Sequence, residues 1–245
     1  MQNCTDFLDF AIFEIRKGET ALIYFSIMGD SISSFVGTQP EGYRVHYDYE
    51  NLQKNAMRYV SDVWWAKVIT HFGGRICVNN SYAGSCVAGK HPYAGNSIKR
   101  TELLHNGNIA PDVVLIYMGI KDFGRGVPIK KKFPFWKNPI YFEDAYHLML
   151  KRIENNYPNA RIICGTIART YHARIQNWQF PEEFSGIPLE EYNESIRFLA
   201  QKHKCEVADL SASQVYYETL DGTHPTLIGQ EELARGWIAC LSGIL

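Results

Sequence analysis

The chain of 245 residues lacks the features that mark membrane and nucleic-acid-binding proteins. None of its apolar runs approaches the ~20 residues that a membrane span requires, so we expect no membrane association. The formal net charge is −1, which offers no basic surface for nucleic acid. The short basic run Lys130–Lys132 is typical of a solvated loop.

The first twenty residues also lack the pattern of a secretory signal. Asp6, Asp9 and Glu14 interrupt the apolar residues there, and no basic segment precedes them. We therefore expect a cytoplasmic protein, although a chain whose leader had been removed would look the same.

Metal-binding patterns are missing as well. The six cysteines form no C-x-x-C pair, which favours reduced thiols in a reducing compartment over disulfides or a zinc site. Seven histidines are scattered without a spacing such as H-x-x-x-H, and we interpret them as surface or ordinary hydrogen-bonded side chains. They are His46, His71, His91, His105, His147, His172 and His203. We expect no metal and no cofactor.

What the chain does contain is a series of short apolar runs rich in Val and Ile, each bounded by polar residues or glycine. Such runs are typical of buried parallel strands. They cover residues 21–27, 75–79, 112–118, 161–166 and 205–210. Helical patterns lie between or after them, at residues 56–72, 142–157, 188–204 and 226–241.

Alternating strands and helices predict an α/β fold, a three-layer α/β/α sandwich around a five-stranded parallel sheet of the flavodoxin-like kind. The chain has no repeat, low-complexity segment or linker, so we predict one domain over residues 1–245 with its core at about 21–241. Ligands of such open sheets bind at the carboxyl ends of the strands.

Polar residues follow four of the five predicted strands at that edge. Gly29-Asp30-Ser31 follows the first, and a loop of small residues with Gly84 follows the second. The segments 119–126 and 221–225 follow the third and fifth. Together they supply a hydroxyl, flexible backbone amides, a carboxylate and an imidazole.

This combination suits nucleophilic catalysis. A serine hydroxyl such as that of Ser31 needs a base to take its proton, and a histidine such as His224 serves because its pKa lies near neutrality. A carboxylate on the other ring nitrogen, here Asp221, fixes the tautomer and stabilises the imidazolium. Glycines at 29 and 84 let backbone N–H groups approach an oxyanion closely. Each segment alone also fits an ordinary turn or helix cap.

The joint pattern resembles the SGNH (GDSL-type) hydrolase family over about residues 21–241. The resemblance implies an SGNH hydrolase fold, Ser31 as nucleophile, and Asp221 and His224 of a D-x-x-H motif completing the triad. It also implies an oxyanion hole formed by the backbone of Ser31, by Gly84, and by the asparagine of a G-x-N-D motif. Here that motif reads Gly119-Ile120-Lys121-Asp122, so Lys121 replaces the asparagine.

The resemblance implies a serine esterase that cleaves a small acyl ester, such as an O-acetyl group on a carbohydrate, through an acyl-enzyme. Lysophospholipase and thioesterase activities are further enzymatic alternatives within the family. Two other readings stay open: a binding protein that lost turnover through Lys121, and a flavodoxin-like nucleotide binder that lacks a proper phosphate loop.

Cys86 and the aromatic segment 130–142 each fit more than one role. Cys86 lies two residues past Gly84 but has no evident base of its own, so a nucleophilic role is disfavoured. The aromatic segment 130–142 follows the third strand, and a lid, a substrate wall, a homo-oligomer interface and plain packing all remain open.

Overall fold

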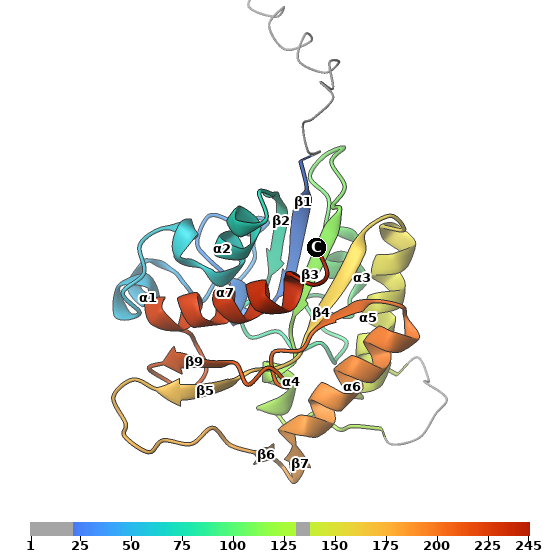
Figure 1. Ribbon diagram of the computed structural model, residues 1–245. Coiled ribbons are helices and arrows are strands. Elements are labelled where there is room, and N and C mark those ends of the chain that lie inside the picture. Colours follow the sequence, from blue (N-terminus) through green and yellow to red (C-terminus); the bar gives the residue numbers. More distant parts are fainter. Residues whose placement is uncertain (1–21, 131–137) are drawn as a thin grey trace, which may run out of the picture.

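Figure 1 shows a computed structural model, which describes residues 22–130 and 138–245. At its centre lies a five-stranded parallel sheet with the strand order β2-β1-β3-β4-β8. The strands are β1 (Tyr24–Gly29), β2 (Arg75–Ser81), β3 (Val113–Tyr117), β4 (Arg161–Gly165) and β8 (Glu206–Ala208). The five strands match the five predicted runs, and the predicted fold class is confirmed.

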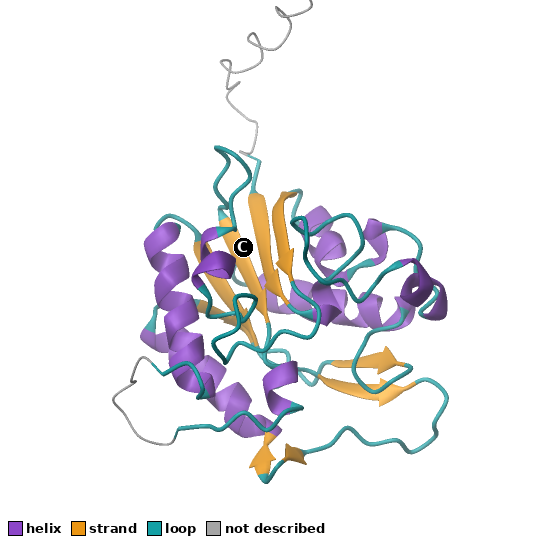
Figure 2. Cartoon of the chain, turned by 180° about the vertical axis from the view of Figure 1, so that it is seen from behind, coloured by secondary structure: helices purple, strands orange, loops and turns teal. Residues whose placement is uncertain are grey.

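Helices cover both faces of the sheet (Figures 1 and 2). One face carries α2 (Trp64–His71) and α7 (Leu227–Leu241), with the short α1 (Tyr49–Lys54) beyond them; the other carries α3 (Ile98–Glu102), α5 (Phe142–Asn156) and α6 (Leu189–Lys202). The buried apolar side chains of the central strands divide between two apolar clusters, one on each face of the sheet.

The alternation along β1 shows how the clusters are divided. Phe25 and Ile27 lie in the cluster that holds Trp237 of α7, whereas Met28 lies in the cluster that holds Met149 of α5. All five side chains are fully buried. Because successive side chains of a strand point to opposite faces, a run such as YFSIMG can fill two cores at once, which is why these strands read as continuous apolar runs.

The predicted helix 56–72 is shorter than expected. The structure has a 3₁₀ turn, η2 (Val60–Asp62), followed by α2 from Trp64. The carboxylate of Asp62 accepts hydrogen bonds from the backbone N–H groups of Arg58 and Tyr59 at 2.7 and 2.8 Å. These bonds fold the segment before Val60 into a turn and compete with helical hydrogen bonding.

Short elements gather at the carboxyl edge of the sheet. They are η1 (Ser31–Ser33), α4 (Ile120–Phe123), a parallel pair β5 (Arg169–His172) and β9 (Tyr216–Thr219), and a hairpin of β6 (Glu183–Phe184) and β7 (Ile187–Pro188). The pair β5–β9 lies past the ends of the main strands (Figure 1). The segment 221–225 therefore follows β9 directly, and not the fifth sheet strand as expected from the sequence.

Two sequence expectations can be compared with the described part of the chain. No helix there has the length and apolar character needed to cross a bilayer. The five described cysteines, at 77, 86, 164, 205 and 240, are all free thiols. Cys4, the run 131–132 and most of the aromatic segment 130–142 lie outside the described residues.

Candidate active site

The tight turn after β1 places Ser31 at the carboxyl edge of the sheet. A side chain at Gly29 would lie 2.6 Å from both Ser33 Cβ and Ser81 Oγ, so only glycine fits there. The carboxylate of Asp30 accepts a hydrogen bond from the Ile32 N–H at 3.0 Å and so caps η1. The turn exposes the Ser31 hydroxyl only slightly, since the residue is 9% accessible.

Ser31, His224 and Asp221 form one hydrogen-bonded chain. Nε2 of His224 lies 2.9 Å from Oγ of Ser31, and Nδ1 lies 2.6 Å from Oδ2 of Asp221. The structure thus brings together three residues that span 193 positions of the sequence, between Ser31 and His224. In this arrangement the Ser31 O–H can donate to Nε2 while the opposite N–H donates to the carboxylate.

The turn from Asp221 to Pro225 sets the orientation of the imidazole. Oδ1 of Asp221 accepts hydrogen bonds from the backbone N–H groups of Thr223 and His224 at 2.9 and 2.8 Å. Gly222 has φ +83°, and a side chain there would lie 2.8 Å from Trp178. The turn therefore depends on glycine both for its backbone conformation and for space.

The carboxylate of Asp221 stays ionised in this setting. Burial acts to raise its pKa, but the hydrogen bond and charge of His224, with the two backbone N–H groups, hold the pKa below its usual range. An ionised Asp221 can support a developing imidazolium without taking its proton.

The His46 ring stacks on the ring of His224. The ring centroids are 3.5 Å apart and the planes differ by 11°. Burial, reinforced by the charge of His224, lowers the pKa of His46 to about 4, so this ring is neutral near pH 7. In the sequence His46 looks like an ordinary histidine, because nothing local links it to a residue 178 positions away.

Within residues 22–130 and 138–245, one group of side chains has atoms close enough to hold a metal ion: His46, Asp221 and His224, with atoms within 4.8 Å of one another. The nitrogen lone pairs of two nearly parallel, stacked rings lie in two nearly parallel planes, so they do not converge on one point as metal ligation requires. The atoms of Asp221 and His224 are also already bonded to each other and to Ser31. The geometry therefore favours a proton-transfer chain over a metal site.

Gly84 lies in the loop that follows β2, with φ +82°. The loop is held by Asp122, whose carboxylate oxygens accept hydrogen bonds from the N–H groups of Val87 and Ala88 at 2.8 and 2.9 Å. Within the described residues, the N–H groups of Ser31 and Gly84 donate to no protein acceptor. Both are therefore available to an oxyanion.

Asp122 is fully buried in this role. Burial raises its pKa to about 7, although the two N–H groups of the loop oppose that rise. In the sequence Asp122 is recognisable only as the last residue of the motif Gly119-Ile120-Lys121-Asp122. Asp122 anchors the loop only because the fold brings it next to Val87, which is 35 residues away in the sequence.

Arg100 is the second buried anchor of the site. Its guanidinium donates to the backbone oxygens of Gly29 and Asn80 at 2.7 Å, and to Ser85 Oγ at 3.3 Å. Burial lowers its pKa to about 10, which still leaves the group charged near neutrality. The residue joins the turn after β1 to the loop after β2. No sequence motif points to Arg100.

Lys121 occupies α4, one turn past the end of β3, and its side chain is exposed. Its charge acts on Asp30 and Cys86, which places it near the Ser31 turn. No hydrogen bond from its ammonium group is present in the described structure. The neighbouring thiol of Cys86 is a poor nucleophile, because burial and the charge of Asp122 raise its pKa to about 12.

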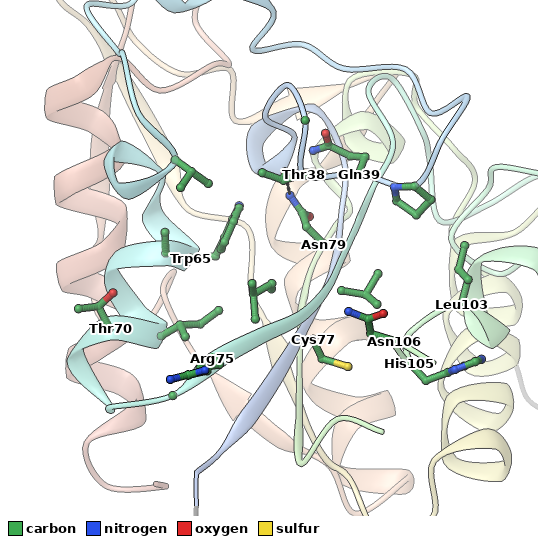
Figure 3. Close-up of a pocket in the computed structure, with 18 residues that line it drawn as sticks. Thr38, Gln39, Trp65, Thr70, Arg75, Cys77, Asn79, Leu103, His105 and Asn106 are labelled. Carbon is green, nitrogen blue, oxygen red and sulfur yellow. Dashed lines mark hydrogen bonds between the residues drawn. The ribbon is translucent and has the colours of Figure 1, made fainter. Parts of the chain in front are cut away.

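One cavity is lined by the loop that follows β2, and another is lined by β2 itself. A cavity of about 260 Å³ adjoins Gly84 and is lined by Arg44, Tyr82, Ser85, Tyr93 and Arg125, among others. A larger cavity of about 810 Å³ runs along the free edge of β2, with Trp65, Cys77 and Asn79 in its wall (Figure 3). No residue of the Ser31–His224–Asp221 chain lines either cavity, and Gly84 links the smaller one to the site.

The sequence matches one known protein family. Residues 23–177 match the family model described as GDSL-like Lipase/Acylhydrolase, which is more than half of the chain. No curated protein is similar enough in sequence to count as a match.

Solved structures share the fold. A GDSL-like lipase from Bacteroides ovatus has 24% identity and a TM-score of 0.70, with 91% of this chain and 100% of that chain covered. A GDSL-like lipase from Bacteroides uniformis has 23% identity and a TM-score of 0.69, with 91% and 97% covered. At this level of identity the likeness establishes the three-layer fold. The family match ends before Asp221 and His224, so it does not cover them, and their assignment to the site follows from the hydrogen-bond geometry.

Proposed function

The chain belongs to the GDSL-like lipase/acylhydrolase family, and from that premise we propose that it is a serine esterase that hydrolyses a small acyl ester. The family supports hydrolase activity. The single observation that carries the finer proposal is the continuous hydrogen-bonded chain from Ser31 Oγ through His224 to Asp221.

The proposed reaction proceeds in two steps. His224 takes the proton of Ser31 as its oxygen attacks the ester carbonyl, and the backbone N–H groups of Ser31 and Gly84 stabilise the tetrahedral oxyanion. The imidazolium then gives the proton to the departing alcohol, which leaves an acyl-enzyme. Water attacks the acyl group by the same route, with His224 again as base, and releases the acid and free Ser31.

The size of the neighbouring cavity supports a small substrate. About 260 Å³ beside Gly84 is below the range of pockets that hold drug-sized ligands. The larger apolar cavity along β2 is lined neither by the proposed triad nor by Gly84, whereas Gly84 lines the small cavity, so the space that adjoins the proposed oxyanion hole is the small one. This favours short acyl groups, such as O-acetyl on a carbohydrate, over lysophospholipids and long-chain thioesters.

Two assays test the proposal. A fluorophosphonate probe should label the wild-type chain at Ser31, and p-nitrophenyl acetate should be hydrolysed. Ser31→Ala should abolish labelling and lower kcat by roughly 10⁴–10⁶, and Asp221→Asn should cost less because the histidine remains. Substantial turnover by Ser31→Ala would show that the nucleophile is misassigned.

A binding protein without turnover is the second candidate, and the exposure of Lys121 is the observation that favours it. If the ammonium stays in solvent, the oxyanion hole has two backbone donors and no side-chain donor. Loss of one such donor costs roughly 10²–10³ in rate. Labelling by the probe without measurable ester turnover would support this candidate.

A further inference from the structure

The small cavity beside Gly84 has a strongly cationic wall. Arg44 and Arg125 both line it, and neither guanidinium makes an ion pair with the residues that the structure describes. A side chain added at Gly84 would lie 4.0 Å from Nη1 of Arg44, so this guanidinium adjoins the proposed oxyanion hole. Nη1 of Arg125 lies 3.7 Å from the Cys86 thiol on the same loop.

A third guanidinium lies beneath the cavity floor. Arg100 is fully buried and donates to Ser85 Oγ, which lines the cavity. Its other hydrogen bonds go to neutral groups, the backbone oxygens of Gly29, Asn80 and Tyr93 and the side-chain oxygen of Asn80. Its charge is therefore not cancelled by a bonded carboxylate, and a buried charge is screened less than an exposed one.

Negative charge is scarce on the same wall. None of the described residues that line the cavity is Asp or Glu. Asp30 and Asp122, the nearest buried carboxyls, are 1% and 0% accessible and bond to backbone N–H groups. The exposed Lys121 adds a further positive charge close to Cys86.

Aromatic rings complete the cavity. Tyr82 and Tyr93 stack with centroids 4.2 Å apart and planes at 11°, and both line the cavity. A wall of flat rings beside two guanidiniums suits a compact group that has a polar, negatively charged end.

We propose that this cavity binds an oxyanion, a carboxylate or a sulfonate- or phosphate-like group, carried by the ester substrate. The inference rests on the proposed esterase function for its setting, and it names the substrate class of that site: small esters with a negative charge close to the ester bond. Arginine suits this role because its planar fork binds oxyanions through two parallel hydrogen bonds. The position of Lys121 adds to the same field.

Matched aryl acetates test the substrate class. The compounds are 3-acetoxybenzoate, 3-acetoxybenzenesulfonate and neutral 3-acetoxybenzamide. The rate for each compound is divided by its hydroxide-catalysed rate to remove differences in leaving group. We expect kcat/KM to be at least about tenfold higher for the two anions, and the ratio to shrink as NaCl rises from 0.05 to 0.5 M. Equal values for charged and neutral esters would overturn the proposal.

Substitutions assign the preference to the two arginines. Arg44→Gln and Arg125→Gln should each lower the anion-to-amide ratio by about threefold, so that the two together remove a tenfold preference, and Arg44→Lys should retain part of it because the charge remains without the fork. Arg75→Gln is the matched control, since Arg75 begins β2 at the opposite end of the sheet. A ratio that falls equally in Arg75→Gln would contradict the assignment.

A binding measurement separates this inference from the proposed function. Ser31→Ala should bind 3-hydroxybenzoate more tightly than 3-hydroxybenzamide in calorimetry, whether or not the wild type turns over any ester. Preferential binding without turnover would support the anion site and refute the esterase. Turnover of the neutral ester with no preference in rate or binding would support the esterase and refute the anion site.

Discussion

The imidazole of His46 lies face to face with that of His224, with ring centroids 3.5 Å apart, while the edges of the His224 ring bond to Ser31 and Asp221. The two edge contacts fix where the nitrogens point but leave the ring free to tilt about the line that joins them. The stacked His46 ring restricts that tilt. Because His46 has a pKa of about 4, it does so without placing a second charge beside the imidazolium.

We expect His46→Ala to lower kcat by roughly 10–10², since a small misplacement of a catalytic group can cost that much. His46→Phe keeps a flat neutral ring and should recover most of the loss. KM should change less than kcat in both variants. The thermal midpoint of each variant should be measured alongside, because a loss that follows unfolding and is equal in Ala and Phe would contradict a positioning role.

Lys121 offers a second kinetic test. Lys121→Asn supplies a neutral side-chain donor at the position where the family pattern has asparagine, and on a neutral activated ester we expect kcat to rise by roughly 10–10³. Lys121→Ala is the control, which removes the charge without adding a donor. If Lys121→Ala is tenfold slower than wild type and Lys121→Asn is no faster than wild type, the lysine itself is the working donor.

A substitution at Asp122 tests whether activity depends on the position of the loop that carries Gly84. Asp122→Asn leaves one acceptor oxygen for two N–H groups and turns an amide donor toward the other, so the loop should shift and kcat should fall by roughly 10–10². Asp112→Asn is the matched control: Asp112 also accepts a backbone N–H, that of Tyr24, but at the opposite edge of the sheet. It should affect stability alone. Equal losses of kcat in the two variants would contradict the role of the anchor.

The sequence was sufficient to predict the layers of the fold because each strand is a short run such as DVVLIYM, apolar on both faces, and because tertiary packing reinforces the same pattern. It also predicted that Ser31, Asp221 and His224 would meet at the carboxyl edge of the sheet, but it placed the segment 221–225 after the fifth sheet strand, whereas that segment follows β9. The short pair β5–β9 was not predicted, because its strands carry mixed polar residues without a clear period.

The residues that complete the site were beyond prediction for a different reason. His46, Arg100 and Arg44 act through contacts across long separations, and locally each looks like a surface residue. A buried arginine that bonds no carboxylate, such as Arg100, is rare enough that composition argues against it. The roles of such residues follow only from the tertiary contacts that each side chain makes.

The last prediction concerns stability and pH. Asp30 is almost inaccessible, and burial raises its pKa to about 6, against the hydrogen bond from Ile32 and the charges of His224, Arg100 and Lys121, which lower it. Between about pH 4 and pH 6 the folded chain therefore holds a proton on Asp30 that the unfolded chain has released. Where the folded state binds more protons, the free energy of unfolding falls as pH rises. This contribution is present below about pH 4 and is lost as pH rises through 6.

Asp30→Asn removes the titrating carboxyl group, while the side-chain oxygen of the asparagine can still accept a hydrogen bond from the Ile32 N–H. Urea unfolding at pH 4.5, 5, 5.5 and 6 should show that the free energy of unfolding falls less steeply in the variant, by at most about 1.4 kcal/mol per pH unit. Taking the difference between the two chains removes the contribution of His46, which has the opposite sign because its pKa is lowered. Parallel curves for the two chains over this range would show that Asp30 is already ionised in the folded state at pH 4.5.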